Sequence, residues 1–271
     1  MKTPTIVLTI AGSDSSGGAG IQADIKAISA LGSYAASVIT SVTAQNTLGV
    51  QAIHPIPTDM VCKQIESVME DLHPKSLKIG MVCNMEIATI IAECLHHYTP
   101  QWVVYDPVMV STSGHQLMTD ETIDIIRREL IPKASLITPN LHEAQILLGE
   151  KIKHLPEMEK GAGILGKTYG CSVLIKGGHL EGGEMCDVLY DAKEEKIFHF
   201  HAPKIKSSNL HGTGCTLSSA IATKLSQGHP MKESIALAKD YVTKAIDAAK
   251  EMQIGQGYGP LWHFYEKERS F

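Results

Sequence analysis

The sequence predicts an α/β fold in which helices cover both faces of a mainly parallel sheet. Short apolar runs of strand length alternate with longer amphipathic stretches along the chain, and this alternation is typical of βαβ units. The chain has 271 residues, of which 44% are hydrophobic and 20% charged. That composition is ordinary for a globular protein, and α/β folds of this size commonly form one domain. We therefore expect a single domain over residues 1–271.

The first elements set the pattern. The apolar run Thr5–Ile10 predicts a strand that ends at a Gly/Ser-rich loop, and Gly20–Leu31 predicts a helix because its isoleucines recur at helical spacing. Further apolar runs predict strands at Ala36–Thr43, Ser76–Ile79, Trp102–Tyr105, Leu136–Thr138 and Ser172–Ile175. The amphipathic stretches between them predict helices at Thr58–Leu72, Asn84–His97, Thr119–Leu130, Leu141–Leu148 and Glu157–Tyr169.

The pattern changes in the last third of the chain. Asp187–Tyr190 and Lys196–His201 are joined by a short polar link, which predicts an antiparallel hairpin. Two long helices are expected after it, at Thr216–Gln227 and Met231–Met252. In open parallel sheets, ligands bind beyond the carboxyl ends of the strands. The loops that follow strands are therefore the place to look for a functional site.

Charge and composition narrow the classes of partner and compartment. The formal net charge is −5 and there is no long basic run, which argues against nucleic acid as a partner. No apolar run approaches the ~18 residues of a membrane helix, and the N-terminal apolar run is interpreted as a strand, not a signal peptide. The six cysteines form no CxxC pair. Free thiols in a reducing cytoplasm fit this pattern best.

The stretch His211-Gly212-Thr213-Gly214-Cys215 runs directly into an Ala/Leu/Ser-rich segment that is expected to be a buried helix. Free N–H groups and the helix dipole make such a start an anion site, well suited to phosphate. At that position the Cys215 thiolate should be favoured, and it would accept a proton from a substrate hydroxyl. The alternative is a Gly-rich turn with a half-buried cysteine.

Two earlier loops suit a flat ligand. The loop from Ala11 to Gly20 is rich in glycine and serine, so that a ligand can lie against its backbone, yet it matches neither a Walker A loop nor a GxGxxG motif. Gln45 follows a predicted strand, and its amide could donate to and accept from an aminopyrimidine edge at once. A flexible turn and a surface amide remain the alternatives for these two stretches.

Four polar residues follow later strands. Asp106, Asn140 and Glu143 offer hard oxygen ligands of the type that holds magnesium, directly or through water. Lys176 ends the most apolar strand and precedes two glycines, which suits a nucleotide phosphate. The alternatives are a first-turn charge that favours the helix dipole for Glu143 and a solvated lysine for Lys176.

Seven short stretches of the chain, taken in order, resemble one known family. They are AGSDSSGGAGIQAD, VTAQNT, KIGM, DPVM, TPNLHEA, KGGHL and HGTGC, and the closing GPLWHF also matches. The chain resembles the hydroxymethylpyrimidine/phosphomethylpyrimidine kinases of thiamine biosynthesis. The resemblance implies a ribokinase-like three-layer αβα sandwich that transfers the γ-phosphoryl group of ATP. Its substrates would be 4-amino-5-hydroxymethyl-2-methylpyrimidine and then that compound's monophosphate, and the family suggests a homodimer.

The resemblance also implies roles for particular residues. Gln45 would hold the pyrimidine, within a pocket walled by Gly12, Ala19, Met81 and Val108. Cys215 and the backbone of Gly212, Thr213 and Gly214 would serve the transferred phosphoryl group. Asp106 and Glu143, with Asn140 beside them, would manage Mg²⁺, and Lys176 would contact the ATP phosphates. Many related sugar kinases carry Asp at the position of Cys215, so the identity of the base is less certain here than in those relatives.

Two rival interpretations remain open. A pyridoxal/pyridoxine kinase shares the fold and most motifs, but Gln45 in AQNT favours an aminopyrimidine. A non-catalytic pyrimidine sensor is the other rival. Retention of Lys176, Glu143 and Cys215 argues against it, because binding alone would not need all three.

Overall fold

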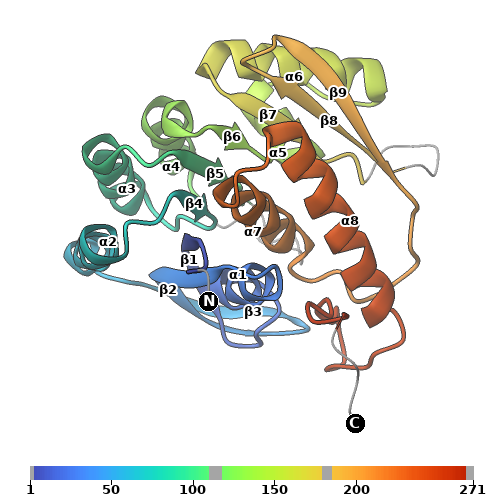
Figure 1. The fold of residues 1–271 in the computed structure, drawn as a ribbon, viewed down its shortest axis with the longest axis horizontal. Helices are drawn as coiled ribbons and strands as arrows, with labels where there is room; N and C mark the ends of the chain where they lie inside the picture. Colours follow the sequence, from blue (N-terminus) through green and yellow to red (C-terminus); the bar gives the residue numbers. More distant parts are fainter. Residues whose placement is uncertain (1–2, 110–117, 179–184, 267–271) are drawn as a thin grey trace.

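The computed structural model describes residues 3–109, 118–178 and 185–266. These residues form a nine-stranded sheet in the order β3-β2-β1-β4-β5-β6-β7-β8-β9 (Figure 1). The strands are β1 (Ile6–Asp14), β2 (Tyr34–Asn46), β3 (Gly49–Pro55), β4 (Ser76–Ile79), β5 (Trp102–Tyr105), β6 (Leu136–Ile137), β7 (Ser172–Ile175), β8 (Met185–Asp191) and β9 (Lys196–Ala202). The central strands pair in parallel, whereas β3, β8 and β9 pair antiparallel at the two edges.

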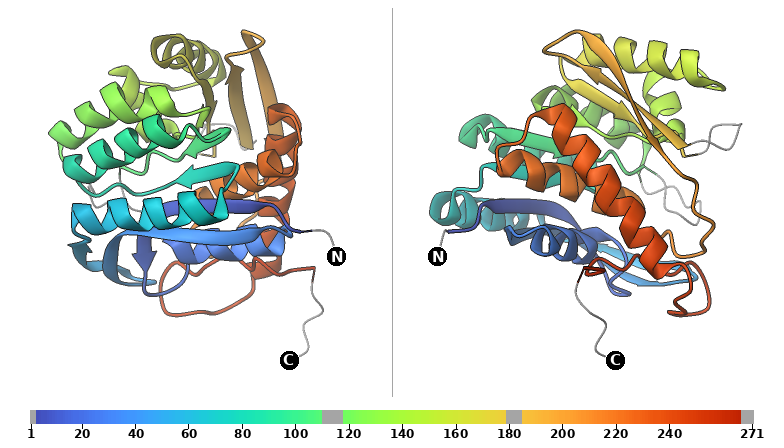
Figure 2. Two further views of the ribbon diagram at one scale, coloured as in Figure 1. Left: turned by 60° about the vertical axis from the view of Figure 1, so that its left-hand side comes forward. Right: turned by 45° about the vertical axis from the view of Figure 1, so that its right-hand side comes forward.

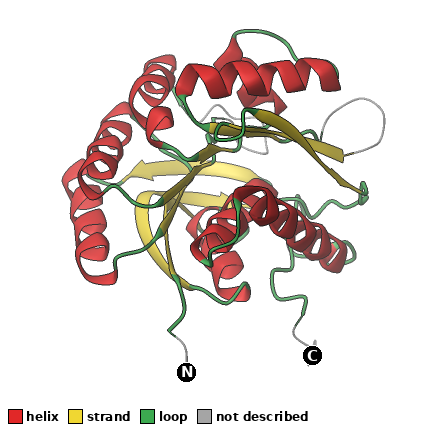
Figure 3. Cartoon of the chain, turned by 45° about the horizontal axis from the view of Figure 1, so that its top comes forward, coloured by secondary structure: helices red, strands yellow, loops and turns green. Residues whose placement is uncertain are grey.

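Helices cover both faces of the sheet, so the predicted three-layer αβα arrangement is confirmed (Figures 2 and 3). One layer contains α2 (Thr58–Leu72), α3 (Met85–Tyr98), α4 (Asp120–Ile125), α5 (Leu141–Leu148) and α6 (Leu155–Tyr169). The other layer contains α1 (Gly20–Ala30), α7 (Thr213–Ser226) and α8 (Met231–Ala249). Within the described residues, no helix combines the length and the apolar character needed to cross a bilayer.

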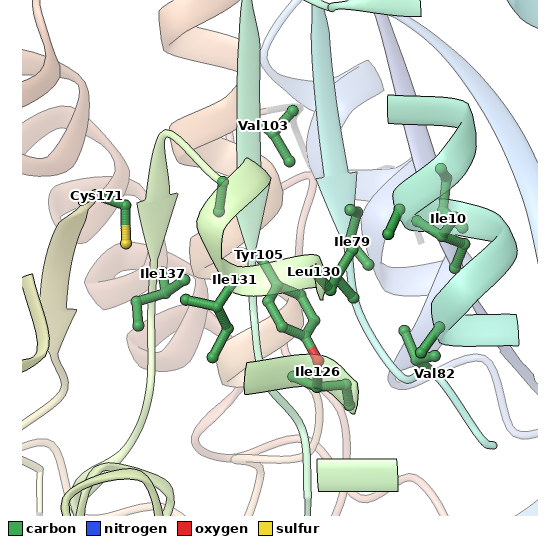
Figure 4. Packing of buried hydrophobic residues seen from close by; sticks show 14 of the residues in the cluster. Ile10, Ile79, Val82, Val103, Tyr105, Ile126, Leu130, Ile131, Ile137 and Cys171 are labelled. Carbon is green, nitrogen blue, oxygen red and sulfur yellow. The ribbon is translucent and has the colours of Figure 1, made fainter. Parts of the chain in front are cut away.

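Strand β5 shows how the two layers share the sheet. Val103 and Tyr105 belong to the core under the first helical layer, while Val104 between them belongs to the core under the second. Figure 4 shows the Tyr105 ring packed among aliphatic side chains that include Ile126. A strand buried on both faces is apolar along its whole length, which is why short continuous apolar runs marked such strands in the sequence.

The two N-terminal strands are longer than predicted. β1 continues through the Gly/Ser-rich segment to Asp14, with a register shift between Ala11 and Ser13. β2 continues to Asn46 because it pairs with β3, a strand that the sequence analysis missed. β3 is half-buried or exposed along its whole length, so it carries little hydrophobic pattern and depends on its backbone ladder with β2. Gln45 therefore lies in a strand and not in the loop that was expected.

Several helix boundaries also differ from the prediction; α8, for example, ends at Ala249 and not at Met252. The helix expected at Thr119–Leu130 is α-helical only as far as Ile125 and continues as a π turn (Ile126–Leu130) and a 3₁₀ turn (Ile131–Lys133). Pro132 explains the change, because proline has no N–H and its ring clashes with the preceding helical turn. α7 begins at Thr213, three residues earlier than expected, so Cys215 lies within its first turn.

Candidate active site

Loops from the carboxyl ends of β1, β4, β5, β6 and β7 meet the N-terminus of α7. The contacts described below show where the residues that the sequence analysis had assigned to substrate, phosphate or metal lie relative to this region. His179 of the KGGHL motif and the segment 110–117 lie outside the described residues.

The start of α7 is fixed by a close approach of two loops. Gly212 precedes the helix with a φ of 84°, a conformation that favours glycine. A Cβ atom at this position would lie 1.9 Å from the carbonyl oxygen of Gly18, so only glycine fits. Thr213 uses both its N–H and its hydroxyl to donate to the carbonyl of Leu210. The first-turn amides of Gly214 and Cys215 are therefore the donors that the anion site would use.

Asp106 and Lys176 form a shielded ion pair next to this helix start. Lys176 Nζ lies 2.7 Å from Asp106 Oδ1, and the Thr138 hydroxyl donates to the same oxygen over 3.1 Å. Both the other Asp106 oxygen and Lys176 Nζ are 3.3 Å from the place where a Cβ of Gly214 would lie. The lysine that was expected to contact phosphate is thus beside the anion site, where it is held by a carboxylate.

Glu143 has two roles in the structure. With Asn140 it forms a capping box at the start of α5, since the side chain of each residue accepts from the backbone N–H of the other. The carboxyl group is also buried, with 2% of the residue exposed. Burial raises its pKa to about 7, and Asp106 contributes to the rise against the opposing effect of Lys176. Glu143 therefore caps the start of α5 and also lies close to the ion pair of Lys176 and Asp106.

A pH-dependent stability is expected from Glu143. An acid whose pKa rises from 4.5 unfolded to about 7 folded retains its proton in the folded state when the unfolded chain has lost it. Its contribution to stability therefore falls as pH rises from about 4.5 to 7. Glu143→Gln keeps a capping oxygen but cannot ionise. In this variant the loss of unfolding free energy between pH 5 and pH 8 should shrink by about 1–3 kcal/mol, as measured by denaturant titration.

The matched control for this measurement is Glu86→Gln, because Glu86 is an exposed first-turn glutamate on α3. It should follow the pH dependence of the wild-type protein. If Glu143→Gln does the same, then Glu143 ionises in the folded state as it does in the unfolded chain.

The prediction of a lowered pKa for Cys215 is wrong. The sequence analysis expected a lowered pKa at the helix start, but burial of the sulfur raises the pKa of Cys215 to about 11. The Lys78 ammonium and the Gly20 amide act to lower it, while the carboxylates of Asp24 and Asp106 add to the rise. Desolvation outweighs the helix start, so the half-buried side chain is a thiol at neutral pH.

Asp14 organises the first loop, a role that the sequence analysis missed. Its carboxylate accepts from the amides of Ser16, Gly18 and Ala19, and it lies 2.8 Å from Nε2 of His211. Burial acts to raise the pKa of Asp14, but the hydrogen bonds from His211 and the loop hold it well below its usual value. An Asp side chain that accepts from the backbone N–H two residues later is a common turn feature. The long-range partner of Asp14 has no such signal.

The side chain of Gln45 lies next to the pair formed by Asp14 and His211. Its amide nitrogen lies 3.3 Å from Nε2 of His211, and its amide oxygen accepts from the Thr43 hydroxyl over 3.2 Å. The side chain is half-buried, and the backbone of Gln45 is fixed by two hydrogen bonds with Ser15. Because Nε2 of His211 donates to Asp14, it cannot also accept from the amide nitrogen of Gln45, so only the amide oxygen is held before any ligand binds.

The residues expected to wall a pocket have a few defined contacts in the structure. A Cβ atom on Gly12 would lie 2.7 Å from Cε of Met81, so these two predicted wall residues are in contact. Val108 follows Asp106 and donates its N–H to the carbonyl of Asp106. Ala19 joins the loop held by Asp14. Met81, Val108 and Ala19 are all half-buried, so a ligand could reach them.

The carboxylates near Lys176 suit magnesium only in part. Among the residues that the structure describes, no three His, Cys, Asp or Glu side chains group as a ready metal site. Asp106 and Glu143 offer two carboxylates, whereas the Asn140 oxygen is engaged in capping α5. Mg²⁺ is commonly held by one or two carboxylates, with substrate phosphates and water completing the octahedron. The donor set thus fits an ion that arrives with a nucleotide.

Comparison with known proteins places the chain among vitamin kinases. The family model described as phosphomethylpyrimidine kinase matches residues 14–262. A hydroxymethylpyrimidine/phosphomethylpyrimidine kinase of Rhizobium meliloti (strain 1021) is 46% identical over 261 residues, which cover 96% of this chain and 97% of the relative.

Solved structures agree with this result. Phosphomethylpyrimidine kinase from Clostridium difficile 630 is 44% identical, with a TM-score of 0.80 over 89% of this chain and 99% of that one. Pyridoxal kinase from Staphylococcus aureus, solved with AMP-PCP and pyridoxal, is 32% identical, with a TM-score of 0.88 over 97% of this chain and 95% of that one.

Proposed function

Because the chain belongs to the phosphomethylpyrimidine kinase family, we propose that it phosphorylates 4-amino-5-hydroxymethyl-2-methylpyrimidine and then its monophosphate, with ATP as the donor. Family membership confirms the resemblance drawn from seven short motifs, together with the ribokinase-like fold. One observation carries the proposal at the level of atoms. Lys176, Asp106 and the first turn of α7 converge at Gly214, where a phosphoryl group would meet a cation and backbone donors.

The residues of this site would act mainly by position and charge. Phosphoryl transfer requires in-line placement and stabilisation of charge on the transferred group, and little covalent chemistry from the protein. The amides of Gly214 and Cys215 would donate to that group, and the Lys176 ammonium would contact the ATP phosphates. Gln45 would pair with the aminopyrimidine edge and so direct the hydroxymethyl group toward Cys215.

Magnesium would be held by Asp106 and Glu143 and would neutralise charge on the nucleotide phosphates. The ion pair between Lys176 and Asp106 keeps both groups in place before binding. A cation near Asp106 would also favour the ionised form of Glu143, whose pKa of about 7 leaves it partly protonated at neutral pH. Metal binding and ionisation of Glu143 are therefore coupled.

This coupling predicts the behaviour of Glu143→Gln in activity assays. Neutralising one oxygen ligand weakens the hold on magnesium, so turnover at limiting Mg²⁺ should fall while the fold stays intact. Raising Mg²⁺ should restore part of the rate, which a titration of activity against Mg²⁺ measures. Wild-type activity at limiting Mg²⁺ would show that Glu143 serves only the capping box.

The substrate itself is tested by parallel kinase assays with hydroxymethylpyrimidine, its monophosphate and pyridoxal. Similarity to pyridoxal kinases keeps that vitamin as the second candidate, while Gln45 favours the aminopyrimidine. We expect Mg·ATP-dependent turnover of both pyrimidines. Far faster turnover of pyridoxal would replace the first assignment with the second, and an absence of turnover with every substrate would favour a sensor.

Gln45→Ala should weaken binding of the pyrimidine much more than binding of ATP. Removal of the amide leaves polar atoms of the ligand unpaired, at a cost of about 1–3 kcal/mol, or roughly 5- to 150-fold in kcat/KM for the pyrimidine. Steady-state kinetics with each substrate varied in turn measures the difference. Gln51→Ala is the control, because Gln51 is an exposed amide on the neighbouring β3. An unchanged kcat/KM in Gln45→Ala would remove Gln45 from the pocket.

Three further assignments belong to the same proposal. A continuous sheet from β3 to β9 supports a single kinase domain. The family resemblance supports a homodimer, which sedimentation would test. The six free cysteines are consistent with a cytoplasmic location.

A further inference from the structure

A buried ion pair lies under the first turns of α7, and no role in holding substrate, phosphate or metal has been assigned to it so far. Lys78, in β4, contacts both carboxylate oxygens of Asp24 in α1, at 2.9 and 2.8 Å. Both side chains have no exposed surface. Removing two charges completely from water is costly, and hydrophobic residues of similar size would fill the space more cheaply. The pair therefore calls for an explanation beyond packing.

The carboxylate of Asp24 joins the pair to α7. The Ser219 hydroxyl donates to Oδ1 over 2.7 Å, and the Thr9 hydroxyl of β1 donates to Oδ2 over 2.6 Å. Ser219 lies four residues after Cys215 on α7, so these two side chains share one face of the helix, one turn apart. The network thus links β1, β4 and α1 to the helix whose first turn is the anion site.

The Lys78 ammonium also depends on a glycine beside it. A Cβ atom on Gly80 would lie only 2.7 Å from Nζ of Lys78, so the absence of a side chain at position 80 leaves room for the cation. Its charge reaches the site, since the ionised forms of Cys215 and Asp106 act together with Asp24 to raise the pKa of Lys78. At Cys215 the effect of Lys78 is larger than the opposing effect of Asp24.

We propose that Lys78 is a positioning residue whose ammonium, held under α7 by Asp24, makes the electrostatic potential at the anion site more positive. A fixed cation close to the place where phosphoryl charge develops stabilises that charge without any reorganisation. The catalytic consequence rests on the proposed phosphoryl transfer. The effect on the potential at Cys215 does not, because it is a property of the free protein.

The rival explanation is a neutral brace that only joins α1, β4 and α7. Three variants separate the two. Asp24→Asn keeps an oxygen for Ser219 and leaves the cation unopposed. Lys78→Met keeps the aliphatic stem and leaves the carboxylate unopposed. The double variant Lys78→Met/Asp24→Asn is neutral and buries no unpaired charge, so it provides a test even if Lys78→Met fails to fold.

The potential is read from alkylation of Cys215 by two reagents of similar size. Iodoacetate is an anion and iodoacetamide is neutral, and the thiolate attacks the methylene carbon of either reagent and displaces iodide, so the ratio of the two rates cancels the thiolate fraction. Peptide mapping by mass spectrometry gives this ratio at Cys215. Cys83 in the same sample is the internal control, because Glu86 is the charge that acts on its pKa and Lys78 is not among the causes of its shift.

An electrostatic role predicts opposite signs in the two single variants. The iodoacetate/iodoacetamide ratio at Cys215 should rise about 3- to 10-fold in Asp24→Asn and fall by a similar factor in Lys78→Met. It should fall less in the double variant, in which the larger effect of Lys78 and the smaller effect of Asp24 are removed together. The ratio at Cys83 should not change.

Ratios that move in the same direction in both single variants, or that stay within twofold of wild type in all three, would overturn the proposal in favour of a brace. Kinase assays on the same proteins keep this result apart from the proposed function. If the ratios shift as expected but wild-type protein phosphorylates no substrate, the electrostatic inference stands and the kinase assignment fails.

Discussion

Replacement of Lys176 by methionine is expected to reduce kcat by about 10²–10³ and to raise the KM for ATP. One preorganised donor aimed at developing charge contributes an effect of this size. The ammonium pairs with Asp106 beside the helix start at Gly214, and methionine keeps its aliphatic stem but not its charge. Binding of hydroxymethylpyrimidine should change little, because Gln45 belongs to a different part of the site.

The measurement is steady-state kinetics with ATP and pyrimidine varied separately. Lys176→Met leaves Asp106 buried beside no cation, so circular dichroism and pyrimidine binding must first show that the variant is folded. Lys63→Met is the control, because Lys63 forms an exposed ion pair with Asp59 on α2. A folded Lys176→Met variant with the KM for ATP unchanged and a kcat loss below about tenfold would place the nucleotide phosphates elsewhere.

Local sequence patterns were sufficient to predict much of this site. Asp106 and Lys176 follow strands that are buried on both faces, and the carboxyl ends of parallel strands meet at one edge of the sheet. This geometry brings the two residues to 2.7 Å although 70 positions separate them. The sequence analysis also gave a charge in the first turn of a helix as one interpretation of Glu143, and the structure shows a capping box with Asn140 there.

Other features were beyond such reasoning because they depend on partners far away in the sequence. The pairing of Asp14 with His211 spans 197 positions and that of Asp24 with Ser219 spans 195. No rule of sequence spacing predicts either pair. β3 escaped detection for a different reason, since an exposed edge strand carries little hydrophobic pattern. Ladder bonds with β2 define it, and they follow from the tertiary fold.

The pKa of Cys215 also depends on groups that lie far away in the sequence. The position of Cys215 at a helix start was predicted from local sequence, and a helix start alone lowers a thiol pKa. Burial and the carboxylates of Asp24 and Asp106 act in the opposite direction and raise the pKa to about 11. Those groups come from α1 and from the loop after β5, so no window of sequence around Cys215 contains them.

Because its pKa is raised, the proposed role of Cys215 as proton acceptor can be tested by the pH dependence of the two phosphorylation rates. The first phosphorylation deprotonates an alcohol, so a positioned base assists it, whereas the second attacks with a phosphate oxygen that is already anionic. If the thiolate is the base, the first rate should follow the thiolate fraction and rise about tenfold per pH unit between pH 7 and 9, well below the pKa of about 11. The second rate should stay flat, because the monophosphate has lost its second proton by pH 7.

Cys215→Ala should therefore slow the first step about 10²- to 10⁴-fold and abolish its pH slope, with a much smaller effect on the second step. The backbone donors of the anion site remain in this variant, so the ratio of the two rates isolates the contribution of the thiol. Cys83→Ala controls for loss of another half-buried cysteine. Equal losses in both steps, or a pH slope that survives in Cys215→Ala, would mean that Cys215 shapes the phosphate site while another group, or the substrate's own ionisation, removes the proton.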